Sequence, residues 1–484
     1  MKRLSLLSPI AWALCSALAP PLSAADGHGG RPNVLFIIAD DLTATALSCY
    51  GNTTCRTPNI DRLATRGTRF TRAFCNATYC GPSRASMLSG YYPHATGVLG
   101  YTSPRPAIGG RATWPQHFKD AGYYTARVGK IYHMGVPGGI EEGSDGADDP
   151  ASWSERFNSP GPEWKAPGAG ETLEGNPDGK KPVVGGNTFV VVEADGDDLV
   201  HSDGKTAAKA EELIREHAGE PFFLAVGFVR PHVPFVAPRK YFEPFLPYDK
   251  LMLPPKVAGD WDDIPPAGIN YKTSVNMRMD VRRQEKAVGG YLASVAYMDA
   301  QVGKVLDALE RSGQAGNTVV VFTSDHGYHL GEHDFWAKVS LHDESAKVPL
   351  IVHVPGKRPS ACHSLVELID LYPTVAGLCG LEVPARLQGE DLSRMFDDPS
   401  YQVRDSAFCV APSSRGFLLR EDRWAFIQYA EDASKGIELF DMANDPGQYT
   451  NLAGKPEFAP VVEGFRARLA ARRAEVQDND LKPN

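Results

Sequence analysis

Two apolar segments, far apart in the sequence, each lead into acidic residues. Residues 34–39 read VLFIIA and are followed by Asp40 and Asp41, while residues 318–322 read TVVVF and end three positions before Asp325. Unbroken apolar runs of this length predict strands that are buried on both faces, as in an α/β sheet. Ligands of such sheets bind at the carboxyl ends of the strands, so we expect both acidic segments at one site.

The rest of the chain alternates in the same way, with helical spacing between apolar runs, which favours a layered α/β fold. We expect helices at 57–64, 207–217 and 291–312, and a further buried strand at 222–229. From about residue 402 the pattern changes to short alternating runs and then a basic helix at 457–475. The sequence therefore predicts a catalytic domain at 31–398 and a subdomain at 399–484 with a small antiparallel sheet and a closing helix.

Residues 135–204 are rich in Gly, Pro and Asp and show little periodicity, which is typical of a long functional insert. Trp153 and Trp164 lie within it. Their side chains either stack on a sugar ring or anchor the insert to the body of the protein, and the sequence leaves both interpretations open.

The first 25 residues have the layout of a secretory signal peptide. Lys2 and Arg3 precede an apolar run at 4–22 that several prolines interrupt, and small residues follow at 23–25. The apolar run is short and broken, which disfavours a membrane anchor. We therefore expect a secreted or periplasmic protein that is not held in a membrane.

The formal net charge of −9 would become −11 once the two basic residues of the signal are removed. This balance disfavours binding to nucleic acid or to anionic membranes, so an anionic substrate needs a local cluster of cations. Seven of the eight cysteines lie beyond the signal, so at least one is unpaired, and the sequence leaves the pairing of the others open.

Residues 79–84 read YCGPSR at the expected start of a helix. Pro82 suits the first turn, and Arg84 lies about one turn after Cys80. The amino end of a helix offers free N–H groups that bind anions. Burial or pairing in a disulfide is the commoner role of a cysteine in an exported protein, and the surrounding motif is what distinguishes Cys80.

The motif Cys-x-Pro-Ser-Arg with a nearby glycine resembles that of type I sulfatases, in which the cysteine is oxidised to formylglycine. The resemblance extends from Asn33 to Asp441 and is greatest to the branch that contains iduronate-2-sulfatase. It implies an α/β fold of the alkaline-phosphatase/sulfatase type, with a large central mixed sheet flanked by helices. It also implies a formylglycine-generating or sulfatase-maturating enzyme as a partner.

The same resemblance implies a metal site. Its ligands would be Asp40, Asp41, residue 80, Asp325 and His326, with Ca²⁺ expected and Mg²⁺ as the alternative. Many sulfatases have Asn where His326 stands, whereas the iduronate-2-sulfatase branch has His. Hydrated formylglycine carries two hydroxyls on one carbon, of which one attacks sulfur and the other, once deprotonated, expels sulfate.

Further cationic residues match elements of the family in sequence and order. They lie in Gly-Lys-x-x-His, in Arg-Pro-His-x-Pro-Phe and in Trp-Ala-Lys, and comprise Lys130, His133, Arg230, His232 and Lys338. By resemblance, Arg84 and Lys130 stabilise the charge on residue 80, and His133 takes a proton as sulfate leaves. His232 and Lys338 would bind sulfate and protonate the departing oxygen, and the sequence does not decide which of them donates.

Two expected substrate contacts carry less support from the motifs. Arg230 replaces the lysine that the branch often has before Pro-His, which keeps the charge but changes the hydrogen-bond geometry. His329 lies close in sequence to the metal ligands, as does His333, and we interpret each as a substrate contact or a structural residue.

Two other functions remain to be weighed. One is hydrolysis of phosphate or phosphonate monoesters, although the second set of metal ligands that two-metal phosphatases need is not evident. The other is non-catalytic binding of sulfated glycans, which would be expected to lose catalytic side chains that this sequence retains. The residues favour an exo-acting sulfatase for polysaccharide degradation. The branch indicates a 2-O-sulfated uronic acid as the substrate. This choice of substrate is an analogy, because specificity resides in variable loops.

Overall fold

The computed structural model describes residues 31–175, 189–411 and 416–481, and the expected signal peptide at 1–25 lies outside these ranges. Within them, the main sheet has the strand order β13-β2-β12-β9-β1-β7-β3-β4, with β14 paired to β2. Strands β4, β3, β7, β1 and β9 run parallel, and β12 is antiparallel to both of its neighbours. The bounds are β1 (Asn33–Asp40), β2 (Thr68–Phe74), β3 (Tyr124–Gly129), β4 (Glu155–Phe157), β7 (Phe222–Pro231), β9 (Thr318–Ser324), β12 (Lys347–His353), β13 (Ser360–Cys362) and β14 (Val366–Glu367).

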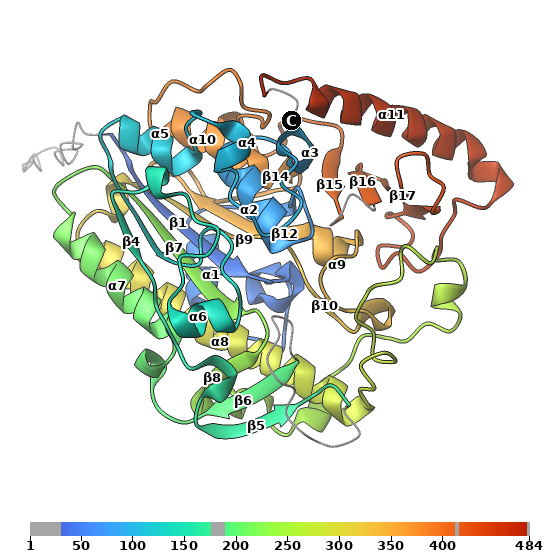
Figure 1. Ribbon diagram of the computed structural model, residues 1–484, viewed down its shortest axis with the longest axis horizontal. Helices are drawn as coiled ribbons and strands as arrows, with labels where there is room; N and C mark the ends of the chain where they lie inside the picture. The colour runs from blue at the N-terminus through green and yellow to red at the C-terminus, as the bar shows by residue number, and fades with distance from the viewer. Residues whose placement is uncertain (1–30, 176–188, 412–415, 482–484) are drawn as a thin grey trace, which may run out of the picture. The chain divides into compact units, whose positions relative to one another are not determined.

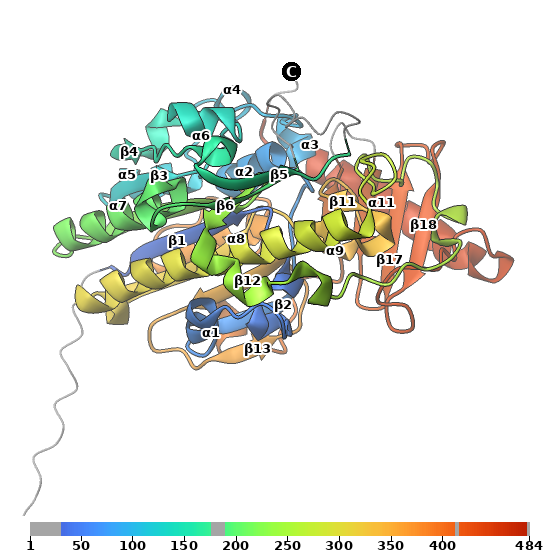
Figure 2. The ribbon, with the colours of Figure 1, turned by 90° about the horizontal axis from the view of Figure 1, so that it is seen from below.

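Strand β1 lies between β7 and β9, and all eight of its residues are buried. Leu35 and Ile37 face the core beneath one group of helices, while Phe36 and Ile38 face the opposite core. Figures 1 and 2 show helices on both faces of the sheet. An unbroken apolar run is therefore required, as the sequence predicts. The first core involves α1 (Pro58–Ala64), α7 (Ser202–Glu216) and α8 (Val281–Arg311), and the second α2 (Cys80–Ser89), α5 (Trp114–Asp120) and α10 (Leu371–Leu378).

The expected helices form, but α8 begins ten residues earlier than its periodicity indicates. The side chain of Asp280 caps its first turn by accepting a hydrogen bond from the backbone N–H of Arg283 at 2.9 Å. The ten added residues, VRRQEKAVGG, are mostly polar residues and glycines, and their buried apolar side chains are Ala287 and Val288. Apolar periodicity is therefore evident only from about Tyr291.

The segment predicted as an irregular insert is partly ordered into small elements. It contains α6 (Gly138–Glu142), and β5 (Gly168–Thr172) and β6 (Val190–Ala194) form a three-stranded sheet with β8 (Phe235–Pro238). Trp153 is 3% exposed, and its indole N–H donates to Asp148 at 3.0 Å. This burial supports the anchoring interpretation of Trp153 rather than stacking on a sugar.

The C-terminal part forms the predicted antiparallel sheet, in the order β15-β16-β17-β18, together with a closing helix. The bounds are β15 (Ala407–Val410), β16 (Gly416–Arg420), β17 (Trp424–Tyr429), β18 (Ile437–Asp441) and α11 (Ala459–Gln477). Shorter elements are α3 (Pro93–Thr96), α4 (Arg105–Ile108), α9 (Asp343–Ala346), and the hairpin of β10 (His329–Leu330) and β11 (Trp336–Ala337).

The seven described cysteines are all free thiols, so the structure contains no disulfide within the described ranges. Among them, the Sγ atoms of Cys75 and Cys409 lie 3.8 Å apart. None of the described helices has the length and apolar character that crossing a bilayer requires.

Candidate active site

The carboxyl ends of β1 and β9 meet, and they bring the two predicted acidic segments together. The backbone N–H of Asp41 donates to Oδ1 of Asp325 at 3.1 Å, and that of Leu42 donates to Oγ of Ser324 at 2.9 Å. Asp41 has a left-handed backbone with φ of 64°, which turns the chain sharply after the strand. The expectation that both segments form one site is confirmed.

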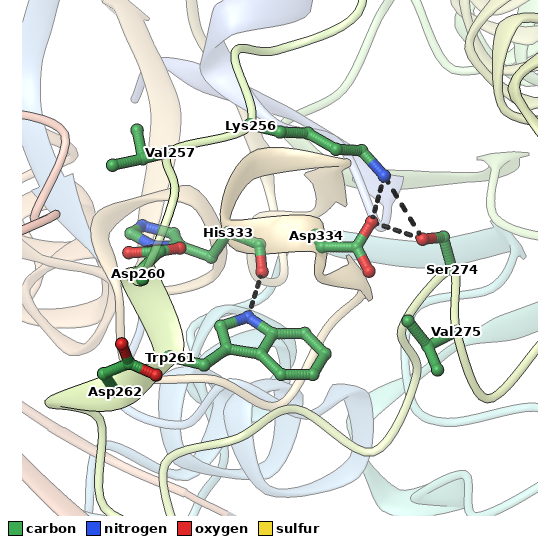
Figure 3. Close-up of a pocket in the computed structure, with 10 residues that line it drawn as sticks. Lys256, Val257, Asp260, Trp261, Asp262, Ser274, Val275, His333 and Asp334 are labelled. Atoms are coloured by element: carbon green, nitrogen blue, oxygen red, sulfur yellow. Dashed lines mark hydrogen bonds and ion pairs between the residues drawn. The ribbon is translucent and has the colours of Figure 1, made fainter.

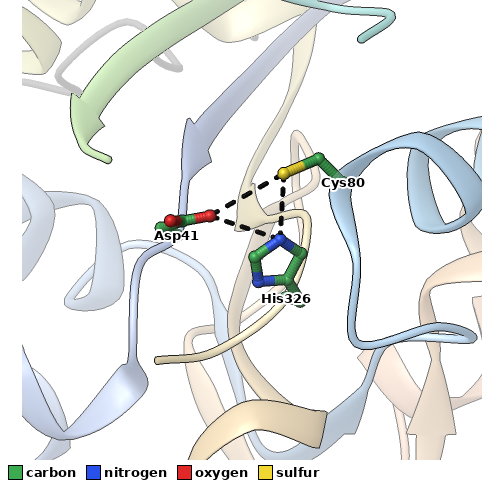
Figure 4. A group of neighbouring side chains, drawn as sticks. All are labelled: Asp41, Cys80 and His326. Atoms are coloured by element: carbon green, nitrogen blue, oxygen red, sulfur yellow. Dashed lines mark hydrogen bonds and ion pairs between the residues drawn. The ribbon is translucent and has the colours of Figure 1, made fainter. Parts of the chain in front are cut away.

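Cys80 is the first residue of α2 and lies against these strand ends. Its Sγ is 3.1 Å from Nζ of Lys338, 3.2 Å from Nε2 of His326 and 3.8 Å from Oδ1 of Asp41. Figure 4 shows Asp41, Cys80 and His326 pointing toward one another from three separate segments. All four side chains are fully buried, and burial raises the pKa of the Cys80 thiol.

Two cations hold Asp40 and Asp325 in place. Arg84 donates from Nε to Oδ2 of Asp325 at 2.8 Å and from a terminal nitrogen to Oδ1 of Asp40 at 3.1 Å. Lys130, which directly follows β3, donates to the other oxygen of Asp40. Burial opposes ionisation of Asp40, yet the charges of Lys130 and Arg84 hold its pKa well below the ordinary value. Asp40 is therefore an ionised carboxylate.

Asp41 is less well compensated. Its Oδ1 accepts a hydrogen bond from Nζ of Lys338 at 2.6 Å, but Oδ2 has no hydrogen-bond partner among the described residues. Burial raises the pKa of Asp41, and Lys338 and His326 offset only part of that effect. A buried carboxylate oxygen without a partner is costly unless a ligand satisfies it.

The donor set fits a divalent cation. One ligand atom each from Asp41, Cys80 and His326 lie within 4.8 Å of one another, and the same holds for Asp40, Cys80 and Asp325. Three carboxylates offer the oxygen ligands that Ca²⁺ and Mg²⁺ prefer, and the free Oδ2 of Asp41 offers a position for such an ion. An imidazole is a less usual ligand for either ion than a carboxylate.

His232 and Lys338 complete the cluster. His232 lies with Nε2 3.7 Å from Oδ2 of Asp41, and its Nδ1 donates to the carbonyl of Val233 at 2.5 Å. Burial, followed by the charge of Lys338, lowers the pKa of His232 well below its ordinary value. Burial also opposes the charge of Lys338, but Asp41 and Cys80 raise its pKa well above the ordinary value. In this arrangement His232 is neutral and Lys338 is charged.

Two expected substrate contacts lie outside the cluster. Arg230 is 3% exposed, pairs with Glu163 at 2.5 Å and donates to the carbonyls of His232 and Pro234, so it braces the segment that carries His232. His329 is fully buried with Nε2 2.6 Å from Oγ of Ser340. These surroundings favour a supporting role for both, and direct contact with substrate stays a prediction for each.

Sequence reasoning did not identify several residues that support the site. Glu163 balances the charge of Arg230, Oγ of Ser83 donates to the Asp325 carbonyl, and the hydroxyl of Tyr291 donates to the Asp41 carbonyl. Tyr101 stacks on His133. Each of these contacts joins residues far apart in the sequence. Ser83 belongs to the Cys-x-Pro-Ser-Arg motif, whereas Glu163, Tyr291 and Tyr101 carry no motif that would single them out.

A separate cavity of about 340 Å³ lies at the tip of the β10–β11 hairpin (Figure 3). Trp261 lines it and donates from its indole N–H to the His333 carbonyl at 2.7 Å, and Lys256 pairs with Asp334 at 2.8 Å. The imidazole of His333 bonds to Asp260 at 3.1 Å. The described residues around this cavity include none of the Cys80 cluster, so His333 lies outside that cluster, and its role stays a prediction.

A mixed α/β sheet with buried carboxylates, cations and a helix-terminal cysteine at its carboxyl edge defines an ester hydrolase of the alkaline-phosphatase and sulfatase fold. The chain matches the sulfatase family over residues 32–381, and the C-terminal region of N-sulphoglucosamine sulphohydrolase over residues 331–475. The chain therefore belongs to the sulfatase family, and it is a sulfuric ester hydrolase.

Similar proteins of known name agree with this assignment. A sulfatase of Formosa agariphila is 32% identical over 464 residues, which cover 92% of this chain and 87% of that protein. The iduronate 2-sulfatase of Mus musculus is 34% identical over 476 residues, which cover 89% and 78%. In fold, a phosphonate monoester hydrolase of Agrobacterium radiobacter has a TM-score of 0.76 at 22% identity and covers 92% and 96% of the two chains.

Proposed function

We propose that the protein is an exo-acting sulfatase that uses formylglycine at position 80 and a divalent cation to remove sulfate from a sulfated sugar. The observation that carries this proposal is the position of Cys80. Its Sγ lies at the amino end of α2, within 3.8 Å of Lys338, His326 and Asp41. A group placed there is next to both the carboxylate of Asp41 and the cations that an anionic substrate needs.

The acidic residues would hold the cation. Ca²⁺, or Mg²⁺ as the alternative, would be bound by Asp40, Asp41, Asp325, His326 and residue 80. A bound cation of this kind neutralises sulfate oxygens and lowers the pKa of the nucleophile. Arg84 and Lys130 would hold the carboxylates in place and stabilise negative charge on residue 80.

The remaining residues would bind sulfate and move protons. His232 and Lys338 would contact sulfate, and His133 would take a proton as sulfate leaves. Nδ1 of His232 already donates its proton to the Val233 carbonyl, so a neutral imidazole has no proton on Nε2 to give. The charged Lys338 does have one, which favours Lys338 as the acid that protonates the departing sugar oxygen.

The substrate is proposed from burial and from similarity. Cys80 and Lys338 are fully buried and His232 is 4% exposed, so a terminal sulfate group fits this site better than the middle of a chain. The 34% identity to an iduronate 2-sulfatase favours a 2-O-sulfated uronic acid at the end of a polysaccharide or glycosaminoglycan. The signal-like segment at 1–25 supports a secreted or periplasmic location, and conversion of Cys80 would need a formylglycine-generating or sulfatase-maturating enzyme.

The test combines mass spectrometry with a substrate panel. Peptides spanning Tyr79 to Arg84, from protein made in its own source, should carry an aldehyde in place of the thiol. Sulfate release should then be faster from a disaccharide with a terminal 2-O-sulfated uronate than from a 6-O-sulfated hexosamine or a phosphonate monoester. An unmodified thiol with no sulfate release from any sugar would contradict the proposal and favour binding of sulfated glycans without catalysis.

A further inference from the structure

Three imidazoles lie near Cys80, and they differ in how their rings are held. Nδ1 of His326 donates to the Gly327 carbonyl at 2.9 Å, and Nδ1 of His232 donates to the Val233 carbonyl at 2.5 Å. Such a bond fixes both the tautomer and the orientation of a histidine ring. Nδ1 of His133 is buried and has no hydrogen-bond partner within the described ranges, so this ring lacks the usual restraint.

The ring of His133 is held by stacking instead. Its centroid lies 3.7 Å from that of Tyr101, with an angle of 11° between the planes. Tyr101 also stacks on Tyr79, at 4.7 Å and 29°. Two rings cannot share one face of a third at these distances, so Tyr101 lies between the other two. Tyr79 directly precedes Cys80, and the stack thus connects the nucleophile helix to His133.

The segment that carries Tyr101 is fixed against the same helix. A side-chain carbon placed on Gly81 would come 2.3 Å from the backbone oxygen of Gly100, so the two backbones approach as closely as glycine allows. Tyr101 is 45% exposed although both faces of its ring are covered. Its ring therefore has an edge toward solvent.

We propose that Tyr101 is a positioning residue that holds the imidazole of His133 at the orientation needed to take a proton as sulfate leaves residue 80. The inference rests on the proposed function, because His133 has this role only in the sulfatase reaction. With Nδ1 buried, Nε2 is the nitrogen that accepts the proton. Stacking on Tyr101 restrains the plane of the His133 ring, whereas a carbonyl acceptor restrains the rings of His232 and His326.

The charges around His133 keep its imidazole neutral before the reaction. Lys130, Arg84 and Lys338 face it, and Asp40 is the acidic group among its neighbours. Burial, then Lys130, lowers the pKa of His133 to about 2, despite the opposing effect of Asp40. The imidazole is therefore neutral at ordinary pH, and the negative charge of a departing sulfate beside it would favour its protonation.

The chain offers a matched control for the effect of removing a stacked tyrosine. Tyr124 stacks on His217 at 3.4 Å and 10°. Tyr124 is the first residue of β3, at the amino edge of the parallel strands, whereas Lys130 and His133 follow the carboxyl end of that strand. Tyr124→Leu therefore removes a similar tyrosine–histidine stack at the amino edge of the parallel strands, away from the active site at their carboxyl edge.

The kinetic test compares Tyr101→Leu, Tyr101→Phe and Tyr124→Leu in the full, mature chain with an aryl sulfate. Loss of orientation should lower kcat of Tyr101→Leu by about 10- to 100-fold, with KM lowered in step so that kcat/KM changes by no more than about 3-fold. Release of the aryl alcohol in the first turnover should stay fast, so that a burst precedes the slow steady state. Tyr101→Phe keeps the ring and should stay within about 3-fold of wild type, and Tyr124→Leu should show wild-type kcat.

A second readout does not depend on activity. In a Cys80→Ser background, ¹⁵N NMR of the imidazoles, or a crystal structure, should show His133 in one orientation that is lost or averaged in Tyr101→Leu, while His232 and His326 are unchanged. Unchanged His133 signals, an equal loss of kcat in Tyr101→Phe, or a rise in KM alone would each overturn the inference. Absence of sulfatase activity in the wild type would instead count against the proposed function, and the NMR comparison would still decide whether Tyr101 orients His133.

Discussion

Two buried clusters of acidic and basic side chains show how a structural site differs from a catalytic one. The C-terminal cluster, comprising Glu367, Asp370 and Arg404, has a partner for every carboxylate oxygen, and several partners are backbone N–H groups. The Cys80 cluster has as many cations as carboxylates, yet it leaves Oδ2 of Asp41 without a partner.

The difference teaches that burial and charge alone do not identify a catalytic site. Burial raises the pKa of Asp370 to about 6, so a shifted carboxyl also occurs in the structural cluster. The unsatisfied oxygen and the reactive side chain are what distinguish the Cys80 cluster, because an incomplete set of partners leaves room for a ligand. The predictions below test this contrast, from the largest expected effect to the smallest.

Removal of the nucleophile should have the largest effect. Cys80→Ala should lower sulfate release by about 10³-fold or more, since no other group in the cluster can attack sulfur. Cys379→Ala is the matched control, because Cys379 is also a buried free thiol. It should keep full activity per folded molecule, and full activity in Cys80→Ala would contradict the proposed mechanism.

Breaking the C-terminal cluster should reduce stability rather than catalysis. Glu367→Ala leaves Arg404 without one of its buried partners and should lower the free energy of unfolding by about 3–5 kcal/mol. Chemical denaturation measures this loss, and kcat per folded molecule should stay close to wild type. A selective loss of kcat without a loss of stability would place this cluster in the catalytic machinery and break the contrast.

The unsatisfied carboxylate should appear in the pH dependence of stability. Because burial raises the pKa of Asp41, the folded state binds its proton more tightly than the unfolded state. In chelator-treated protein, its contribution is present below about pH 4, the ordinary aspartate range, and is lost as pH rises through the raised pKa. Asp41→Asn should remove this decline, and added Ca²⁺ should offset it in the wild type. Identical pH profiles of the chelated wild type and Asp41→Asn would contradict the assignment.

A surface ion pair should have the smallest effect. Lys357 pairs with Asp397 at 2.6 Å, with side chains 34% and 65% exposed. Lys357→Ala should change the free energy of unfolding by less than about 1 kcal/mol, because water screens exposed pairs. Denaturation at low and high salt measures it. A loss of stability as large as that expected for Glu367→Ala would show that burial does not explain the difference in energy between the buried and the exposed ion pair.

Much of the site follows from the sequence because its residues lie in or beside motifs. Asp40 and Asp41 come directly after a buried strand, and Asp325 and His326 after another, so the parallel sheet brings them together. Lys338 was expected from Trp-Ala-Lys, and its Nζ lies 3.1 Å from Sγ of Cys80. The structure places these motif residues next to one another, while their individual catalytic roles stay predictions.

Other features depended on contacts between distant segments. The sequence offered Arg230 as a substrate contact, but it could not indicate that Glu163 pairs with Arg230 across 67 positions. The segment expected to be irregular contributes strands β5 and β6, because β6 pairs with β8 beyond α7. The early start of α8 depends on the Asp280 cap, which periodicity does not detect.

The sequence by itself determined the strand ends that carry acidic residues, the helix that begins at Cys80 and the family to which these motifs belong. These features are local, since hydrophobic periodicity, capping and short motifs are all set by neighbouring residues. Only the tertiary structure decided that Oδ2 of Asp41 has no partner, that Arg230 is neutralised by Glu163 and that Tyr101 covers His133. The physical reason is that solvent exclusion and side-chain pairing depend on which distant segments pack together, and no local pattern records that choice.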